Sequence, residues 1–243
     1  MLASMPLCFN LLGILKQDLD LASRTFCSLW PATMNTVDGI YFEHSPGRGD
    51  PRYTGDYTAF DTLVTGRSPT GARTFIAVEV KYAETMWEPV PNLRPRLDEL
   101  SAQTDLFIDP DNPQLRHAPI QQLWRQHLLA STLTANGHFD AGLVVVIAPS
   151  MNNAVHHAIR RYRSHLKYTE HPKLGFDAVA LESFILSMGH AGAADYARAL
   201  YRRYCDFLQV DGELCLHLTD TIGTVAAAVV NRIGHLNPDE SAA

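Results

Sequence analysis

The chain has 243 residues, of which 46% are hydrophobic and 19% are charged, and its formal net charge is -6. These values are typical of a soluble globular protein that is large enough for one sizeable core. The excess of acidic residues gives the protein as a whole no electrostatic footprint for nucleic acid, which argues against a nonspecific DNA-binding protein.

No apolar stretch reaches the length of a membrane span. The run from residue 7 to 15 is interrupted by Asn10 and Gly13, and no Lys or Arg precedes it as in a signal peptide. The four cysteines have no C-x-x-C spacing, so a zinc site is not expected, and free thiols are the default although their even number leaves disulfides open. We therefore expect a cytoplasmic protein with no membrane partner.

The spacing of apolar residues and the positions of Gly and Pro predict the elements of the chain. In order, they are a helix at 11–29, strands at 39–43, 57–65 and 74–82, helices at 96–106 and 120–130, a strand at 141–148, a helix at 151–167, a strand at 176–181 and a helix at 191–208. This order predicts an α/β fold with a central mixed sheet flanked by helices. We expect a single domain over 1–243, with a core at about 11–182, a helical extension at about 183–236 and a disordered tail at 237–243.

The strand predicted at 74–82 carries one acid and one base inside an apolar, β-branched run. Glu79 and Lys81 fall on one face, roughly 6.5 Å apart along the strand, while Val78 and Val80 point to the other face. Burying ionised groups is costly unless they are paired, bound to a metal or functional, so the strand is expected to end at a site. The alternative is an edge strand whose wet face carries a cross-strand ion pair.

The strand predicted at 57–65 also carries a single carboxylate, Asp61, and the intervening residues 66–71 are typical of a hairpin. Antiparallel pairing would bring Asp61 beside Glu79 and Lys81. Two carboxylates and a lysine suit a divalent metal with a charge stabiliser, because Mg²⁺ takes oxygen ligands. Asp50 and Asp56 are rivals for the metal, but they lie in a turn-rich segment where aspartate commonly caps the backbone.

The order of Asp61, a hairpin and then Glu79-Val80-Lys81 resembles the PD-(D/E)xK nuclease superfamily, which has the restriction-endonuclease-like fold with an αβββαβ core. The segments 42–48, 59–61 and 79–82 together resemble a bacterial family of restriction-endonuclease-like proteins, and the resemblance covers about residues 7 to 182. One departure is that Phe60 stands where the proline of the motif would be.

The resemblance implies a Mg²⁺-dependent endonuclease that hydrolyses phosphodiester bonds in DNA, in restriction or repair, with Mn²⁺ as a substitute metal. Asp61, Glu79 and the Val80 carbonyl would hold the metal, and Lys81 would orient the water and offset charge. It also implies that Glu43 is a further ligand of the metal or of its water; otherwise Glu43 is an exposed glutamate at a strand end.

The helix at 120–130 matches the family pattern with Gln122 and Arg125, which lie three residues apart and share a face. Their amide and guanidinium groups would act near the scissile phosphate; otherwise they form the polar face of a packed helix. The other candidate contacts for nucleic acid are Arg48 and Arg52 in the loop at 44–56 and Arg160 and Arg161 on the helix at 151–167, where solvated surface is the alternative.

Two further classes of function remain open on the sequence. A nuclease-like fold without activity would bind nucleic acid or another protein, and an α/β protein with a structural ion pair would bind no Mg²⁺. The sequence does not separate DNA from RNA as a substrate, and it leaves a homo-oligomer open.

Overall fold

The computed structural model describes residues 3–88 and 94–206, and residues 1–200 belong to one compact unit. Its strands are β1 (Thr36–His44), β2 (Phe60–Arg67), β3 (Arg73–Val80), β4 (Ala141–Ala148) and β5 (Leu174–Ala180). Its α-helices are α1 (Ser4–Gln17), α2 (Leu19–Leu29), α3 (Pro95–Gln103), α4 (Gln121–Ala135), α5 (Asn153–Arg163), α6 (Leu181–Met188) and α7 (Ala194–Tyr204). A short 3-10 helix spans Pro113–Arg116, and a π-helical turn spans Gly189–Ala193.

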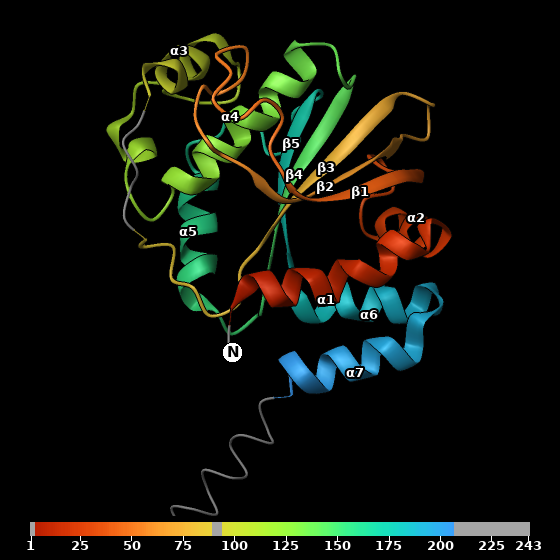
Figure 1. Cartoon of the computed structure of the whole chain (residues 1–243). Helices are drawn as coiled ribbons and strands as arrows, with labels where there is room; N and C mark the ends of the chain where they lie inside the picture. The colour runs from red at the N-terminus through yellow and green to blue at the C-terminus, as the bar shows by residue number, and fades with distance from the viewer. Residues whose placement is uncertain (1–2, 89–93, 207–243) are drawn as a thin grey trace, which may run out of the picture. The chain divides into compact units, whose positions relative to one another are not determined.

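The five strands form one mixed sheet in the order β1-β2-β3-β4-β5. β2 is antiparallel to both β1 and β3, whereas β4 is parallel to both β3 and β5 (Figure 1). The antiparallel strands follow one another through short connections, while β4 is reached through a long crossover that contains α4, as a parallel neighbour requires. The predicted mixed sheet and its αβββαβ core are therefore confirmed.

Helices cover both faces of this sheet (Figure 1). α1, α2 and α6 lie on one face, and α3, α4 and α5 lie on the other. β3 is buried along nearly its whole length because it is the central strand between these two layers. The main core lies between the sheet and α4 and α5, where Trp124 and Phe176 are among the largest buried side chains. This double cover explains why β3 and β4 read as continuous apolar runs rather than as alternating patterns.

The predicted helix at 11–29 is wrong as one element, because the structure has two helices there. Asp18 has extended backbone angles, and its side chain accepts a 2.8 Å hydrogen bond from the Leu21 amide. This is an N-cap, which satisfies a free amide at the start of α2. The short helix α6 was not predicted, since it follows β5 directly with no turn residue between them.

Several other boundaries shift by a few residues. The predicted strand at 57–65 begins at Phe60, while Thr58 is held by hydrogen bonds to the Asp56 side chain instead of a neighbouring strand. The predicted helix at 120–130 continues to Ala135, and the predicted helix at 191–208 is α7 within the described residues. The predicted tail at 237–243 and residues 207–236 of the predicted extension lie outside the described residues.

None of the described helices is long and apolar enough to span a membrane. Cys8 and Cys27 are free thiols, and Cys215 lies outside the described residues.

Candidate active site

The β2–β3 hairpin brings two carboxylates together. Thr62 of β2 pairs with Val78 of β3, so Asp61 comes level with Glu79 on the neighbouring strand. The Asp61 Oδ2 atom accepts a 2.8 Å hydrogen bond from the Val80 amide, which fixes the carboxylate against the end of β3. Burial, reinforced by the negative charge of Glu79, raises the pKa of Asp61 to about 8.

Lys81, the residue after β3, pairs with the Glu79 carboxylate. Its Nζ atom lies 2.9 Å from Glu79 Oε1, and the two side chains are only 8% and 4% exposed. Burial lowers the pKa of Lys81, but the charge and hydrogen bond of Glu79 outweigh this effect, so the net shift is upward and the ammonium stays charged. A buried ion pair of this kind needs additional hydrogen bonds to offset the loss of hydration.

Those hydrogen bonds come from α4. The Gln122 side chain donates a 2.7 Å hydrogen bond to Glu79 Oε1, and the Gln126 side chain donates one to Glu79 Oε2. The two glutamines lie four residues apart and therefore share one helix face. Gln126, which is 3% exposed, also donates a 3.4 Å hydrogen bond to the Ala59 carbonyl. The sequence analysis missed Gln126, although its spacing from Gln122 is a signal that could have identified it.

Arg125 holds the segment before β2, a structural role that was not predicted from the sequence. Its Nη2 atom lies 3.1 Å from Asp56 Oδ2 and donates a 2.7 Å hydrogen bond to the Thr58 hydroxyl. Asp56 also accepts hydrogen bonds from the Thr54 hydroxyl and the Thr58 amide. Although burial raises the pKa of Asp56, these bonds and the Arg125 charge bring it below its ordinary value. The guanidinium predicted to face a phosphate is thus bound within the fold, and Asp56 holds the segment before β2.

Glu43 does not join the two central acids. It stands at the end of β1 with a left-handed backbone, φ 49°, and is exposed, although its charge contributes to the raised pKa of Asp61. Among residues 3–88 and 94–206, no three His, Cys, Asp or Glu side chains gather closely enough to hold a metal together. The structure therefore brings Asp61 and Glu79 together without Glu43 as a third direct ligand.

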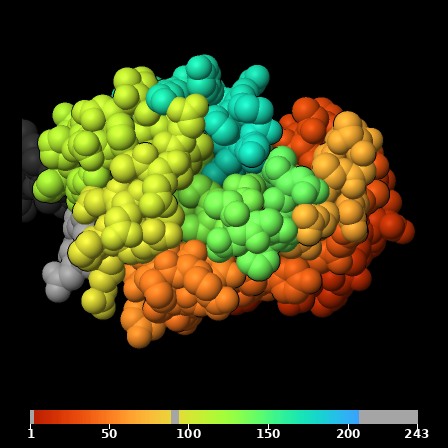
Figure 2. Space-filling model, turned by 90° about the horizontal axis from the view of Figure 1, so that it is seen from above, coloured from red at the N-terminus to blue at the C-terminus, as the bar shows by residue number. Residues whose placement is uncertain are grey.

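The predicted nucleic-acid contacts in the loop at 44–56 are both exposed. Arg48 lies at its surface, and the Arg52 guanidinium pairs with Asp50, with 2.6 Å between Nη2 and Oδ2. The Arg52 side chain is 79% exposed, so this pair adds little to stability. Figure 2 shows the loop against the chain segment of α3, where Arg96 donates a 3.3 Å hydrogen bond to the Tyr53 carbonyl. The Asp50 side chain also accepts a 2.8 Å hydrogen bond from the Arg52 amide and so serves the turn, as expected for an aspartate in such a segment.

Arg160 and Arg161 lie away from the two acids. α5 begins beside the end of β3, where the Asn152 side chain donates a 2.9 Å hydrogen bond to the Tyr82 carbonyl. At 1.5 Å per residue, the last turn of α5, which carries both arginines, lies about 12 Å further along the helix. The structure thus does not bring these two arginines together with Asp61.

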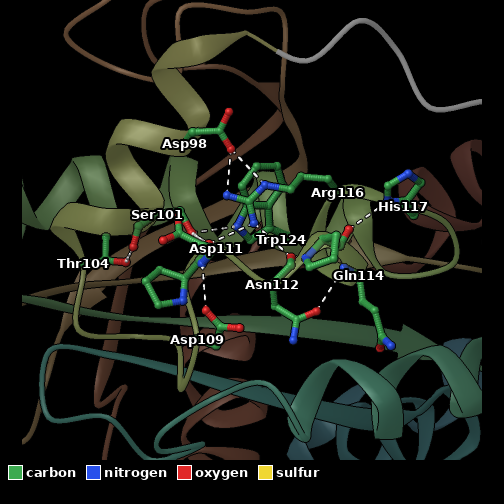
Figure 3. Close-up of polar contacts among 12 residues, drawn as sticks. Asp98, Ser101, Thr104, Asp109, Asp111, Asn112, Gln114, Arg116, His117 and Trp124 are labelled. Atoms are coloured by element: carbon green, nitrogen blue, oxygen red, sulfur yellow. Dashed lines mark hydrogen bonds and ion pairs between the residues drawn. The ribbon is translucent and has the colours of Figure 1, made fainter.

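The segment between α3 and α4 is held by Arg116 (Figure 3). Its guanidinium lies 2.7 Å from Asp98 Oδ1, donates to the carbonyls of Pro110 and Asn112, and stacks 4.9 Å above the Trp124 ring. Arg116 therefore anchors this segment to α3 and α4 and is not free to contact a substrate.

A family model described as the PD-(D/E)XK nuclease superfamily matches residues 1–206. The chain belongs to the PD-(D/E)XK nuclease superfamily. Neither the curated proteins nor the solved structures gave a match. The resemblance inferred from the hairpin motif is therefore confirmed at the level of the superfamily.

PD-(D/E)XK nucleases typically use divalent metals, and the donors of this chain fit one. The carboxylates of Asp61 and Glu79 and the carbonyl of Val80 are hard oxygen ligands, which Mg²⁺ prefers. No described residue donates a hydrogen bond to Asp61 Oδ1, so that oxygen is available. Because Mg²⁺ usually keeps several water ligands, two carboxylates and one carbonyl are enough protein ligands for its coordination shell.

Proposed function

We propose that this protein is a Mg²⁺-dependent endonuclease that hydrolyses phosphodiester bonds in DNA, with Mn²⁺ as a substitute metal. The observation that carries the proposal is the convergence of Asp61, Glu79 and Lys81, in which the lysine ammonium lies 2.9 Å from the glutamate. Membership of the PD-(D/E)XK nuclease superfamily supports it. In the proposal, Asp61, Glu79 and the Val80 carbonyl hold the metal.

The reaction adds water across one ester bond. A water oxygen forms a bond to phosphorus, the bond from phosphorus to the deoxyribose oxygen breaks, and that oxygen leaves with a proton. A bound divalent metal lowers the pKa of water and stabilises the leaving oxygen. The chain supplies a fixed cation, because Lys81 remains charged beside Glu79 and can orient the water or the phosphate.

The glutamines of α4 complete the arrangement. Gln122 and Gln126 hold both oxygens of Glu79, so the carboxylate keeps its direction beside the Lys81 ammonium. Such preorganised groups lower the cost of reorganisation during the reaction. Gln126 is thus a positioning residue in the proposal, and Gln122 has the same contact with Glu79.

The test is incubation of the purified protein with plasmid, linear and single-stranded DNA and with RNA, with Mg²⁺, with Mn²⁺ and with EDTA. Lys81→Met removes the ammonium at similar volume, and the matched control is Lys167→Met at an exposed site. We expect metal-dependent cleavage of DNA that falls at least ~100-fold in Lys81→Met and is unchanged in the control. Full activity in Lys81→Met contradicts the mechanism, and the absence of cleavage with every metal favours a fold that only binds.

A further inference from the structure

A cavity of about 420 Å³ opens beside the buried Lys81–Glu79 pair, at the side of Lys81. Its walls come from the residues before β2, from the chain after β3 and from the first turns of α4. This volume lies within the range of small-ligand sites, which is roughly 300 to 1,000 Å³. Lys81 and Gln122 line both the cavity and the proposed active site. A part of the substrate that enters the cavity would therefore lie directly beside the reacting phosphate.

Gln121 and Gln126 both line this cavity and both have a buried side-chain oxygen without a hydrogen-bond partner among the described residues, but only Gln126 also binds Glu79. Gln121 is only 7% exposed, and its Oε1 atom is the one without a partner. Its neighbour Gln122 has its amide bound to Glu79. Leaving a buried amide oxygen without a partner is unfavourable, so a ligand that supplies a donor would relieve this cost once the Gln121 side chain turns its oxygen towards the cavity. A glutamine amide offers a donor and an acceptor side by side, which matches the edge of a nucleobase.

Tyr57 adds an aromatic surface to the cavity. It lies in the unpaired segment before β2, lines the cavity and is 74% exposed. Exposed aromatic rings beside a nucleic-acid site are platforms on which unpaired bases stack. Tyr57 and Gln121 thus provide the two kinds of contact that a base makes, one with its face and one with its edge.

The charges of the cavity favour a neutral group over a phosphate. Glu84 and Glu88 both line it, and the charge of Arg125 is already offset by Asp56. A phosphate is therefore repelled from the cavity except next to Lys81. A neutral base with N–H donors suits the acidic lining, while the phosphate attached to its sugar remains at Lys81.

We propose that this cavity holds the base of an unpaired nucleotide next to the scissile phosphate, and that the preferred substrate is therefore single-stranded DNA. A base within a duplex has its face covered by stacking and its pairing edge occupied, so it must leave the helix before it can enter such a pocket. The inference rests on the proposed nuclease function, which it refines by naming the form of the substrate.

The test compares binding and cleavage. Binding is measured by fluorescence anisotropy with Ca²⁺, using a labelled single-stranded oligodeoxyadenylate, an abasic strand of the same length and the duplex; cleavage is measured with Mg²⁺. The variants are Gln121→Met and Tyr57→Ala, and the matched controls are Gln114→Met and Tyr168→Ala at exposed positions outside the cavity. Because Tyr57 is exposed, its variant is informative even if Gln121→Met fails to fold.

We expect the wild-type protein to bind the oligodeoxyadenylate about tenfold more tightly than the abasic strand, and each variant to lose most of that difference. Cleavage of the single strand should fall by a similar factor, with both controls unchanged. Equal binding of the two strands, or variants that behave like the wild type, would overturn the base pocket even if Mg²⁺-dependent cleavage is observed. Base-dependent binding that the variants lose, without any cleavage, would support the pocket and overturn the nuclease function.

Discussion

The Asp61 carboxylate accepts a 2.8 Å hydrogen bond from the backbone amide of Val80 across the β2–β3 hairpin. This bond ties an acid of one strand to the residue that lies between Glu79 and Lys81 in the next strand. The relative position of the three charged groups therefore depends on the register of two paired strands rather than on a flexible loop.

Asp61→Asn should abolish cleavage and at the same time stabilise the protein without metal. The pKa of Asp61 is raised from 3.8 to about 8, so the folded state binds a proton that the unfolded state has lost. The contribution of Asp61 to the free energy of unfolding therefore falls as the pH rises from 3.8 towards 8, and asparagine removes this fall. Thermal melts at pH 5 and pH 8 check the prediction. A variant that is less stable than the wild type at pH 8 contradicts it.

Binding of Mg²⁺ should raise the melting temperature of the wild type and leave that of Asp61→Asn nearly unchanged. A ligand that binds only the folded state adds about 2.7 kcal/mol to the free energy of unfolding at a hundred times its Kd. A titration followed by differential scanning fluorimetry, reversed with EDTA, measures the effect. Asp140→Asn, at a half-exposed ion pair, is the control and should respond as the wild type does. An equal rise in Asp61→Asn would remove Asp61 from the metal site.

Gln126→Leu should lower both stability and activity. The substitution takes the donor away from Glu79 Oε2 in a buried setting, which costs about 1 to 3 kcal/mol. Because Glu79 is then free to turn, we expect kcat to fall about tenfold or more with a smaller change in KM. Gln103→Leu, at an exposed position of α3, is the control. A stable variant with unchanged kcat would show that Gln126 does not position Glu79.

Arg125→Met should destabilise the fold through Asp56. The two side chains are 16% and 11% exposed, so we expect a loss of about 2 to 3 kcal/mol, slightly below that for breaking a fully buried pair. Urea unfolding of Arg125→Met, Asp56→Asn and the double variant measures the coupling. The double variant should lose less than the sum of the single losses. Additive losses would mean that the pair makes no net contribution.

His127 should make a contribution to stability that is lost in acid. This side chain is fully buried, its Nδ1 atom lies 2.9 Å from the Tyr162 hydroxyl, and burial lowers its pKa from 6.5 to about 3. His127 binds a proton below pH 6.5 in the unfolded state but only below about pH 3 in the folded state. The contribution of His127 to the free energy of unfolding is therefore full above pH 6.5 and falls by up to about 1.4 kcal/mol per unit between pH 6.5 and about 3, opposite in sign to the contribution of Asp61. His127→Gln should therefore gain stability relative to the wild type as the pH falls from 6.5 to 4; a difference between the two proteins that does not change with pH would contradict this origin.

Local patterns were sufficient to predict the sheet. The strand at 141–148 agrees with β4 at both ends, because a continuous β-branched run between Gly and Pro leaves few alternatives. The hairpin between β2 and β3 followed from its turn residues, and with it the proximity of Asp61 and Glu79. The division of the first helix at Asp18 also has a local cause, since aspartate is a common N-cap, but the apolar spacing on both sides concealed it.

Contacts between segments that lie far apart in the sequence were harder to predict. Gln126 acts on Glu79 from 47 residues away, and Arg125 acts on Asp56 from 69 residues away. A side chain on a polar helix face has the same local pattern whether it meets solvent or a buried charge. The sequence could therefore place Arg125 on the correct helix face but not identify its partner.

The residues of the candidate active site come together across different separations in the sequence. Asp61 and Val80 are 19 residues apart and meet when a short hairpin closes, whereas Gln122 lies 43 residues beyond Glu79. Closing the longer loop costs more entropy, so the two acids come together before the amides that hold them. A folding intermediate containing the hairpin alone would carry its charges unsupported, and catalytic competence would then arise only in the final docking of α4.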